Sequence, residues 1–349
     1  MKKYNNFLKF SIVFRCDAAE LPEIGSGHLY RSLVIAYFLK EKFRLKSKEI
    51  LFLVKTKKKF KKCLEILKHH KFTIKSVDHK IKDYSKLETK IIGKFCANLL
   101  IIDRLGNVKK EFIDNIHKNY EKKIIIDDSS NHRKMFDLSL NPLIQNVRKF
   151  DGCKVGFKYQ ILNNKIVKKN KKNFNYKNIF IFFGGFDSKK IAIKILKVLE
   201  NINLKLIINL PFSYKSKKNI LKSKHKINYF NPENYLNKLV ESNIAIIAGG
   251  LSLFDAILNK KKIICIPQYK HQEINAKIIS KTNAINYINF NDEKFTVKLI
   301  NIFNKIYKNK KYEKKIEKIQ ERIISHKKVK HNLNLISNLY KKTIKKDKL

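Results

Sequence analysis

Acidic side chains are scarce in this chain of 349 residues. Asp and Glu total 29 against 78 Lys and Arg, which gives a formal net charge of +49. Such an excess is typical of proteins that bind nucleic acids. The lysines, however, are spread along the whole chain and do not gather in one arm or stripe. We therefore predict a solvated basic surface that binds no nucleic acid but attracts anionic substrates such as nucleotide diphosphates.

Cysteine is also sparse, and its pattern excludes several kinds of site. The cysteines are odd in number, widely spaced and without a CxxC pair: Cys16, Cys63, Cys96, Cys153 and Cys265. This pattern argues against a disulfide framework and against a zinc site, so we predict no bound metal. It is typical of a protein of the reducing cytoplasm, which is the location we expect.

Long hydrophobic runs are absent. No stretch approaches the ~20 apolar residues that a membrane-spanning helix needs, so we predict no stable membrane insertion. The first fourteen residues superficially resemble a short signal peptide, but Arg15, Cys16 and Asp17 follow at once without a small-residue cleavage site. A buried first strand explains this segment better.

Several motifs that define large enzyme classes are missing too. The sequence has no GxxxxGK[ST], no HExxH, no GxSxG, and no GxGxxG opening the first predicted helix. These absences count against P-loop nucleotide-binding proteins, zinc proteases, hydrolases with a nucleophile elbow and simple dinucleotide-binding proteins. We predict no cofactor.

Short β-branched runs alternate with helical patterns along the whole chain, which is typical of parallel βαβ units. The predicted strands are 10–14, 50–54, 72–74, 99–102 and 124–126 in the first half, and 179–183, 204–208, 227–230, 244–247 and 263–266 in the second. The 44% of hydrophobic residues can fill two cores. We predict an α/β fold of two Rossmann-like doubly wound domains that face a cleft.

The first predicted domain covers residues 1–170 and the second covers residues 171–349. The Lys/Asn-rich segment 165–177 has no periodicity and is predicted to approach a linker between the domains. The tail from Asn291 is basic and helical, and we assign it to the second domain with its lysines in water. In doubly wound folds ligands bind outside the carboxyl ends of the strands, so site residues should follow strands directly.

The first candidate site follows the first predicted strand, and its members are Arg15, Asp17, Gly25, Gly27, His28 and Arg31. Two glycines one residue apart allow a tight turn and a close approach of a ligand to the backbone. His28 would stand in the first turn of the next helix, where the helix dipole disfavours imidazolium and favours a proton acceptor. The alternative is that the glycines only make the turn and that His28 is a surface residue.

Further candidates follow other predicted strands. Asp103, Asp127 and Asp128 come after strands of the first half, where carboxylates are placed to contact a substrate, although Asp128 could equally cap a loop. In the second half, glycines open two strand-to-helix turns that could wrap a phosphate. The candidates there are Gly185 and Asp187 in the first turn, Gly249, Gly250, Ser252 and Asp255 in the second, and Gln272 beyond the following strand. Asp187 could alternatively cap its helix.

These residues together resemble the signature of a known family. The segment from Arg15 through Arg31 is similar to the R-x-D…IGxGHxxR pattern of the UDP-2,4-diacetamido-2,4,6-trideoxy-β-L-altropyranose hydrolases of pseudaminic acid biosynthesis. The Gly184-Gly185-Phe186-Asp187 motif and the Gly249-to-Gln272 segment follow in the same order with similar spacing. The second-half motifs also resemble glycosyltransferases such as the one that adds N-acetylglucosamine to lipid-linked muramyl-pentapeptide.

The resemblance implies a glycosyltransferase B-type fold and hydrolysis of a UDP-sugar at its anomeric carbon, with inversion and without a metal. The free sugar would serve nonulosonic acid synthesis. His28 would be the general base and Asp17 a second catalytic residue. Asp255 stands where the family has a glutamate for the ribose.

Two other functions stay open at this stage. A UDP-sugar-dependent glycosyltransferase of the same fold would use the same donor site. A basic binding protein without enzymatic activity would show salt-sensitive nucleic-acid binding and no response to UDP.

Overall fold

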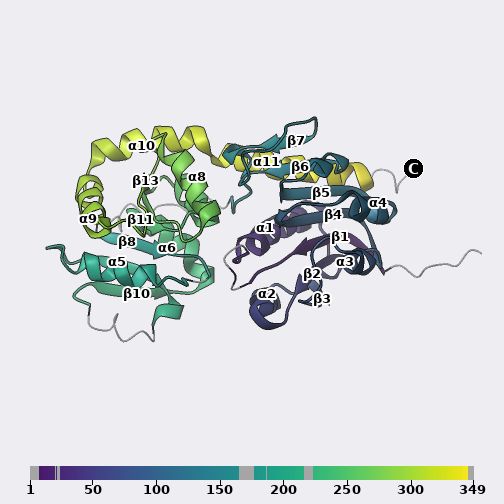
Figure 1. Cartoon of the computed structure of the whole chain (residues 1–349), viewed down its shortest axis with the longest axis horizontal. Coiled ribbons are helices and arrows are strands. Elements are labelled where there is room, and N and C mark those ends of the chain that lie inside the picture. Colours follow the sequence, from purple (N-terminus) through teal and green to yellow (C-terminus); the bar gives the residue numbers. More distant parts are fainter. Residues whose placement is uncertain are drawn as a thin grey trace, which may run out of the picture. The chain divides into compact units, whose positions relative to one another are not determined.

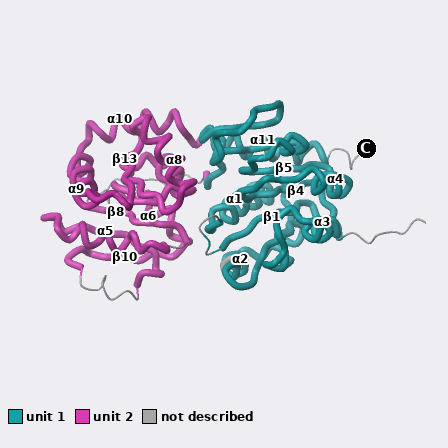
Figure 2. The backbone as a smooth tube through the Cα atoms, in the orientation of Figure 1, with its two compact units in different colours: residues 1–163, 327–349 teal, residues 164–326 magenta. Residues whose placement is uncertain are grey.

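The computed structural model describes residues 8–19, 21, 24–164, 177–185, 187–215 and 223–344. The chain divides into two compact units (Figure 2). Unit 1 comprises Met1–Asn163 and Lys327–Leu349, and unit 2 comprises Asn164–His326. Residues 165–176 of the segment predicted to approach a linker (165–177) lie outside the described residues, as does Phe186 of the second motif. Each unit is an α/β body with its own sheet (Figure 1).

Unit 1 contains a seven-stranded parallel sheet in the order β3-β2-β1-β4-β5-β6-β7. Its strands are β1 (Leu8–Cys16), β2 (Ile50–Lys55), β3 (Thr73–Val77), β4 (Phe95–Gly106), β5 (Tyr120–Asp128), β6 (Leu138–Asn141) and β7 (Cys153–Val155). Its helices are α1 (Gly27–Phe43), α2 (Lys61–Lys68), α3 (Lys86–Ile92), α4 (Lys110–Ile116) and α11 (His326–Ile344).

The central strands of unit 1 are apolar on both faces because helices cover both faces of the sheet. All six residues of β2 are buried, for example. The strand order reverses between β1 and β4, where the chain leaves one half of the sheet and begins the other. Ligands of doubly wound sheets bind at this switch point, outside the carboxyl ends of the strands. Arg15 and Asp103 lie at those ends.

Helix α11 belongs to unit 1, which corrects the assignment of the whole basic tail to the second domain. Figure 2 shows it in the colour of unit 1. Its Tyr340 ring packs edge-on against Phe43 of α1, with 4.8 Å between ring centroids. The Asn332 side-chain amide donates to the carbonyls of Lys158 and Gln160, both at 2.9 Å. The apolar stripe of α11 therefore packs against residues that come much earlier in the sequence.

Unit 2 contains a six-stranded parallel sheet in the order β10-β9-β8-β11-β12-β13. Its strands are β8 (Asn178–Phe182), β9 (Ile207–Pro211), β10 (Lys226–Phe230), β11 (Ile244–Ile247), β12 (Lys262–Cys265) and β13 (Asn286–Tyr287). Its helices are α5 (Ile191–Leu199), α6 (Tyr235–Glu241), α7 (Leu251–Leu258), α8 (Lys270–Ser280), α9 (Phe295–Ile306) and α10 (Lys310–Ile323). The switch point lies between β8 and β11.

Two parallel sheets covered by helices confirm the predicted pair of doubly wound domains. Each sheet has the reversal that creates a ligand site at its carboxyl edge. Among the described helices, none combines the length and the apolar character that crossing a bilayer requires.

Candidate functional site

The first turn of α1 holds a buried group around Asp103, which lies near the end of β4. His28 Nδ1 is 2.8 Å from Asp103 Oδ1, and Arg31 Nε donates to Asp103 Oδ2 at 2.8 Å. His28 and Arg31 are three residues apart, so they lie on the same face of α1. All three side chains are buried. We call these three residues the histidine site.

The charge of Asp103 fixes which nitrogen of His28 carries the proton. Burial acts to raise the pKa of Asp103, but the charge and hydrogen bonds of Arg31 outweigh it and hold the pKa below its ordinary value. An ionised carboxylate only accepts hydrogen bonds, so the shorter contact of 2.8 Å to Asp103 favours Nδ1 of His28 as the donor, while Arg31 Nη2 lies 3.2 Å from the same nitrogen. Nε2 of the neutral imidazole then keeps its lone pair and can accept a proton. This arrangement suits a general base.

Arg31 also reaches the end of β5. Its Nη2 is 2.7 Å from Asp127 Oδ2, while Asp127 Oδ1 accepts from the Leu143 amide at 2.8 Å. The sequence analysis named both Asp127 and Asp128 and took Asp128 as the site residue. Asp128 accepts from the amides of Val108 and Ser130, both at 2.8 Å, which are the contacts of a loop-capping residue. Its substrate contact stays a prediction.

Arg15 and Asp17 belong to a different group of residues. Alternate residues of a strand point to opposite faces of the sheet, and Val13, Leu100 and Ile102 face the core between the sheet and helices α3 and α4. Arg15 is two residues after Val13 and Arg104 is two residues after Ile102, so both side chains point to that same face. Asp103 lies between Ile102 and Arg104, so its side chain points to the other face, toward α1. The structure therefore divides the predicted first motif between the two faces of one sheet.

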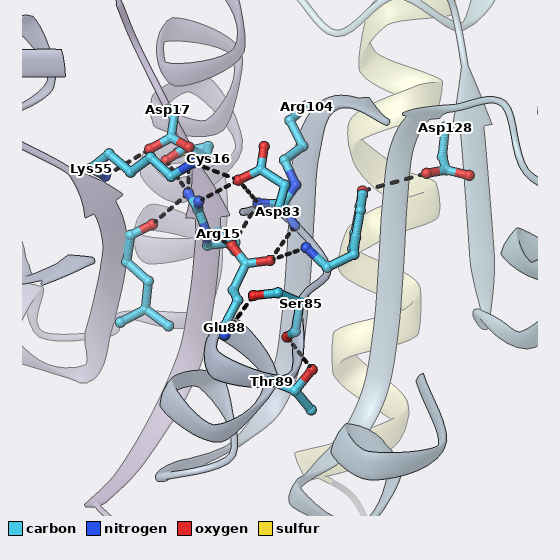
Figure 3. Close-up of polar contacts among 12 residues, drawn as sticks. Arg15, Cys16, Asp17, Lys55, Asp83, Ser85, Glu88, Thr89, Arg104 and Asp128 are labelled. Carbon is cyan, nitrogen blue, oxygen red and sulfur yellow. Dashed lines mark hydrogen bonds and ion pairs between the residues drawn. The ribbon is translucent and has the colours of Figure 1, made fainter. Parts of the chain in front are cut away.

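Figure 3 shows this second group, the charge network, which consists of Arg15, Asp17, Lys55, Asp83, Glu88 and Arg104. Arg15 Nε donates to Glu88 Oε1 at 2.7 Å, and Arg15 Nη1 donates to Asp17 Oδ2 at 2.7 Å. Asp17 Oδ1 accepts from the Lys55 amide at 2.7 Å. Asp17 thus supports Arg15 and the end of β2, and its catalytic role stays a prediction.

Sequence reasoning missed four members of the charge network, namely Lys55, Asp83, Glu88 and Arg104. Glu88 lies in α3, a long way along the chain from Arg15, and no spacing signal links the two. The position of Arg104 could have been predicted from the sequence. It directly follows Asp103 in a strand, so its side chain must point to the opposite face of the sheet.

The glycines of the first motif support the turn that leads into α1. Gly25 has a φ of +56°, a conformation that favours glycine. Its carbonyl accepts from the Ala19 amide at 2.8 Å, which ties the turn back to the segment after β1. Gly27 is the first residue of α1. This turn presents His28 at the carboxyl edge of the sheet, as the sequence predicts.

In unit 2 the Asp187 carboxylate caps the start of α5. Oδ1 accepts from the Ile191 amide at 2.9 Å, and Oδ2 accepts from the Ala192 amide at 3.0 Å and from the Tyr214 hydroxyl at 2.8 Å. These are the contacts of the capping alternative. Gly185, just before it, is exposed. Substrate binding by this turn stays a prediction.

Gly249 and Gln272 form the tightest contact of the predicted nucleotide site. A Cβ atom added at Gly249 would lie 2.7 Å from the Gln272 carbonyl oxygen and 3.0 Å from its Cβ. The same atom added at Gly250 would have the Gln272 Nε2 at 3.6 Å as its nearest neighbour. The turn before α7 and the first turn of α8 thus meet through a glycine. The structure brings Gly249, Gly250 and Gln272 together, and nucleotide binding by them stays a prediction.

We expect Gly249→Ala to lower the free energy of unfolding by about 1–3 kcal/mol, because the added methyl group must push α8 away from the turn. Gly250→Ala is the matched control, since its methyl group meets only an ordinary contact, and it should change stability far less. Urea denaturation of the two variants measures the difference. Equal stability of the two variants would contradict the close approach at Gly249.

Asp255 lies one turn into α7, and its carboxylate Oδ2 is 3.2 Å from the Tyr235 hydroxyl. The Tyr235 ring is packed edge-on against Phe180 and Phe182, with centroids 5.5 and 5.0 Å apart. Burial raises the pKa of Asp255 to about 7, although the hydrogen bond from Tyr235 acts in the opposite direction. Asp255 therefore changes its charge near neutral pH. Ser252, which precedes it on α7, is buried.

The raised pKa of Asp255 predicts a specific pH dependence of stability. Between its ordinary pKa of 3.8 and about 7, the folded chain holds a proton that the unfolded chain has released. The contribution of Asp255 to the free energy of unfolding therefore falls as the pH rises through this window and is level above it. We expect Asp255→Asn to lack this fall. Urea denaturation from about pH 5 to about pH 8, compared with the wild type, measures it.

The exposed Asp114 of α4 supplies the control, because Asp114→Asn should retain the wild-type pH dependence. An Asp255→Asn profile parallel to that of the wild type would show that Asp255 titrates in its ordinary range.

Comparison with known proteins supports the architecture. No family model matches the chain. An uncharacterized protein of Methanocaldococcus jannaschii is 28% identical over 290 residues, which cover 75% of this chain and 57% of that protein. The matched part thus spans little more than half of that relative.

Solved structures match over nearly the whole chain. MurG of Acinetobacter baumannii has a TM-score of 0.63 at 12% identity and covers 95% of this chain and 99% of its own. The spinosyn forosaminyltransferase SpnP has a TM-score of 0.61 at 10% identity, covering 94% and 99%. A UDP-glucose:anthocyanidin 3-O-glucosyltransferase in complex with UDP has a TM-score of 0.61 at 10% identity, covering 95% and 99%. The chain has the glycosyltransferase B-type fold, as predicted.

Proposed function

We propose that this chain acts on a UDP-activated sugar and that His28 removes the proton from the hydroxyl group that attacks the anomeric carbon. The observation that carries the proposal is the hydrogen bond of 2.8 Å between His28 Nδ1 and the ionised Asp103. It leaves Nε2 as the proton acceptor. Arg31 helps to keep Asp103 ionised, and the Asp103 carboxylate orients the imidazole through its contact with Nδ1.

The nucleotide is assigned to unit 2. Gly249 and Gly250 lead into α7, whose first turn offers backbone N–H groups without helical partners, and these suit a diphosphate. The Ser252 hydroxyl adds a donor. Asp255, one turn further, suits the ribose hydroxyls. His28 belongs to unit 1, whereas the residues assigned to the nucleotide belong to unit 2.

The reaction balances without a cofactor. The attacking oxygen forms a bond to the anomeric carbon as its proton passes to His28 Nε2. The bond between the anomeric carbon and the diphosphate oxygen breaks, and UDP leaves with the electron pair. Positioned general base catalysis of this kind contributes about 10²–10⁴-fold. Backbone donors at the α7 turn would stabilise the charge that builds up on the leaving diphosphate.

The first candidate acceptor is a hydroxyl group of a second molecule, which makes the chain a glycosyltransferase. Its support is the likeness to proteins named as a forosaminyltransferase and a glucosyltransferase, one of them in complex with UDP. The histidine site fits this reaction, because the base needs only a hydroxyl group within hydrogen-bond reach.

The second candidate acceptor is water, which makes the chain a UDP-sugar hydrolase as the sequence analysis expected. Its support is local: the segment Arg15–Arg31 resembles the hydrolase family of pseudaminic acid synthesis. The comparisons with solved structures fit transfer better than hydrolysis.

One experiment distinguishes the two acceptors. The chain is incubated with a panel of UDP- and CMP-sugars, and the released sugar and its anomeric configuration are followed by NMR. Rapid UDP release without an acceptor identifies a hydrolase, whereas release only after an acceptor is added identifies a transferase. If no nucleotide sugar is consumed and UDP gives no thermal stabilisation, the proposal is wrong.

A further inference from the structure

The charge network of unit 1 has one member that differs from the other five. The side chains of Arg15, Glu88, Asp17, Arg104 and Lys55 are at most 8% exposed, whereas that of Asp83 is 37% exposed. Asp83 is also the carboxylate that the cations share: Lys55 Nζ is 2.7 Å from it, Arg104 Nη1 3.2 Å and Arg15 Nη2 3.4 Å. Figure 3 shows these side chains converging on it.

Asp83 is held more loosely than the other two carboxylates of the network. Asp17 accepts from the Lys55 amide and Glu88 accepts from the Tyr84 amide, so the backbone fixes both. The contacts of Asp83 all come from side chains, and all of them use Oδ1. Rotation of one side chain into solvent would release it from all three cations.

The cations have more capacity to bind an anion than Asp83 uses. Three of them share a single carboxylate oxygen, although guanidinium groups bind both oxygens of a carboxylate well. In addition, Arg104 Nε is buried and has no acceptor among the described residues. A buried donor without an acceptor is costly, so the residues of the charge network do not satisfy Arg104 fully.

Charge selects the ligand. The network contains three cations and three carboxylates, so that removal of Asp83 alone leaves a net charge of +1 in a largely buried place. A carboxylate restores neutrality. A phosphate monoester, with a charge of about −1.5 to −2 at pH 7, overcompensates. The site lies where β1, β2 and β4 end, at the carboxyl edge where ligands of doubly wound sheets bind.

We propose that Asp83 is an internal occupant of a carboxylate-binding site and that the carboxylate of a small-molecule ligand replaces it on Lys55, Arg104 and Arg15. This inference goes beyond the proposed function and does not depend on it, because binding is measured without a nucleotide sugar. The site lies on the sheet face opposite the histidine site.

Acetate is the probe, and it replaces chloride at constant ionic strength in a buffer free of other carboxylates. Isothermal titration and the acetate dependence of the melting temperature measure binding. Asp83→Asn removes the competing carboxylate and should bind acetate about tenfold more tightly than the wild type, the worth of one charge-assisted hydrogen bond. The wild type should bind acetate weakly but with saturation. Asp114→Asn, an exposed change elsewhere in unit 1, should match the wild type.

Adding Lys55→Met to Asp83→Asn should remove the gain in acetate affinity. We expect the same gain in acetate affinity for Asp83→Ser, which is used in place of Asp83→Asn if that variant does not fold. Equal acetate affinity in the wild type and the Asp83 variants would overturn the proposal, as would a gain that persists with Lys55→Met. Tighter binding of inorganic phosphate than of acetate would overturn the assignment to carboxylates.

Discussion

His28→Ala is expected to lower turnover by about 10²–10⁴-fold, the usual contribution of a positioned general base. UDP affinity should stay unchanged, because the residues assigned to the nucleotide lie in unit 2. The measurement is kcat with the best nucleotide sugar of the panel, together with UDP binding by titration calorimetry.

His132→Ala is the matched control, since His132 is an exposed histidine of the same unit. It should leave both quantities unchanged. Asp103→Asn should lower kcat as His28→Ala does, because an amide no longer forces the proton onto Nδ1. A His28→Ala variant that keeps its kcat, or that loses UDP affinity instead, would remove His28 from the role of base.

Glu88→Ala is expected to have the largest effect on stability, lowering the free energy of unfolding by about 3–5 kcal/mol. The Glu88 side chain is fully buried and accepts from Arg15 at 2.7 Å and from both terminal nitrogens of Arg104 at 2.8 Å. Its removal leaves two buried guanidinium groups without their main partner. Urea denaturation measures the loss.

Glu65→Ala is the control for this variant, because Glu65 is exposed on α2. Its effect should stay within about 0.5 kcal/mol, as is usual for surface substitutions. A similarly small effect of Glu88→Ala would mean that Arg15 and Arg104 find other acceptors when Glu88 is absent.

Local pattern was sufficient to predict the architecture. Ten of the thirteen strands in the described part of the chain were found from the sequence, and the central ones among them are continuous apolar runs bounded by polar residues. Three short strands were not predicted: Leu138–Asn141, Cys153–Val155 and Asn286–Tyr287. These segments are two to four residues long, so they carry too little pattern to be recognised.

The sequence analysis named several residues of the two groups in unit 1, but it did not predict which of them lie together. The chain order placed Arg15, Asp17, His28 and Arg31 in one motif, because they are close in sequence. Sheet geometry separates them, since neighbouring strand residues point to opposite faces. The partner that completes each group, Asp103 for His28 and Glu88 for Arg15, comes from another element. Such a pairing depends on the order of the strands in the sheet, and the local sequence pattern gives no information about that order.

Helix α11 has a consequence for how the chain is made. Unit 1 is built from two separate stretches of sequence, and the second is synthesised only after all of unit 2. Until then Phe43 lacks the Tyr340 ring, and the Lys158 and Gln160 carbonyls lack the Asn332 amide. On the ribosome, unit 2 can therefore finish folding while unit 1 waits for its last helix. A fragment that stops at Asn163 would leave that surface permanently uncovered.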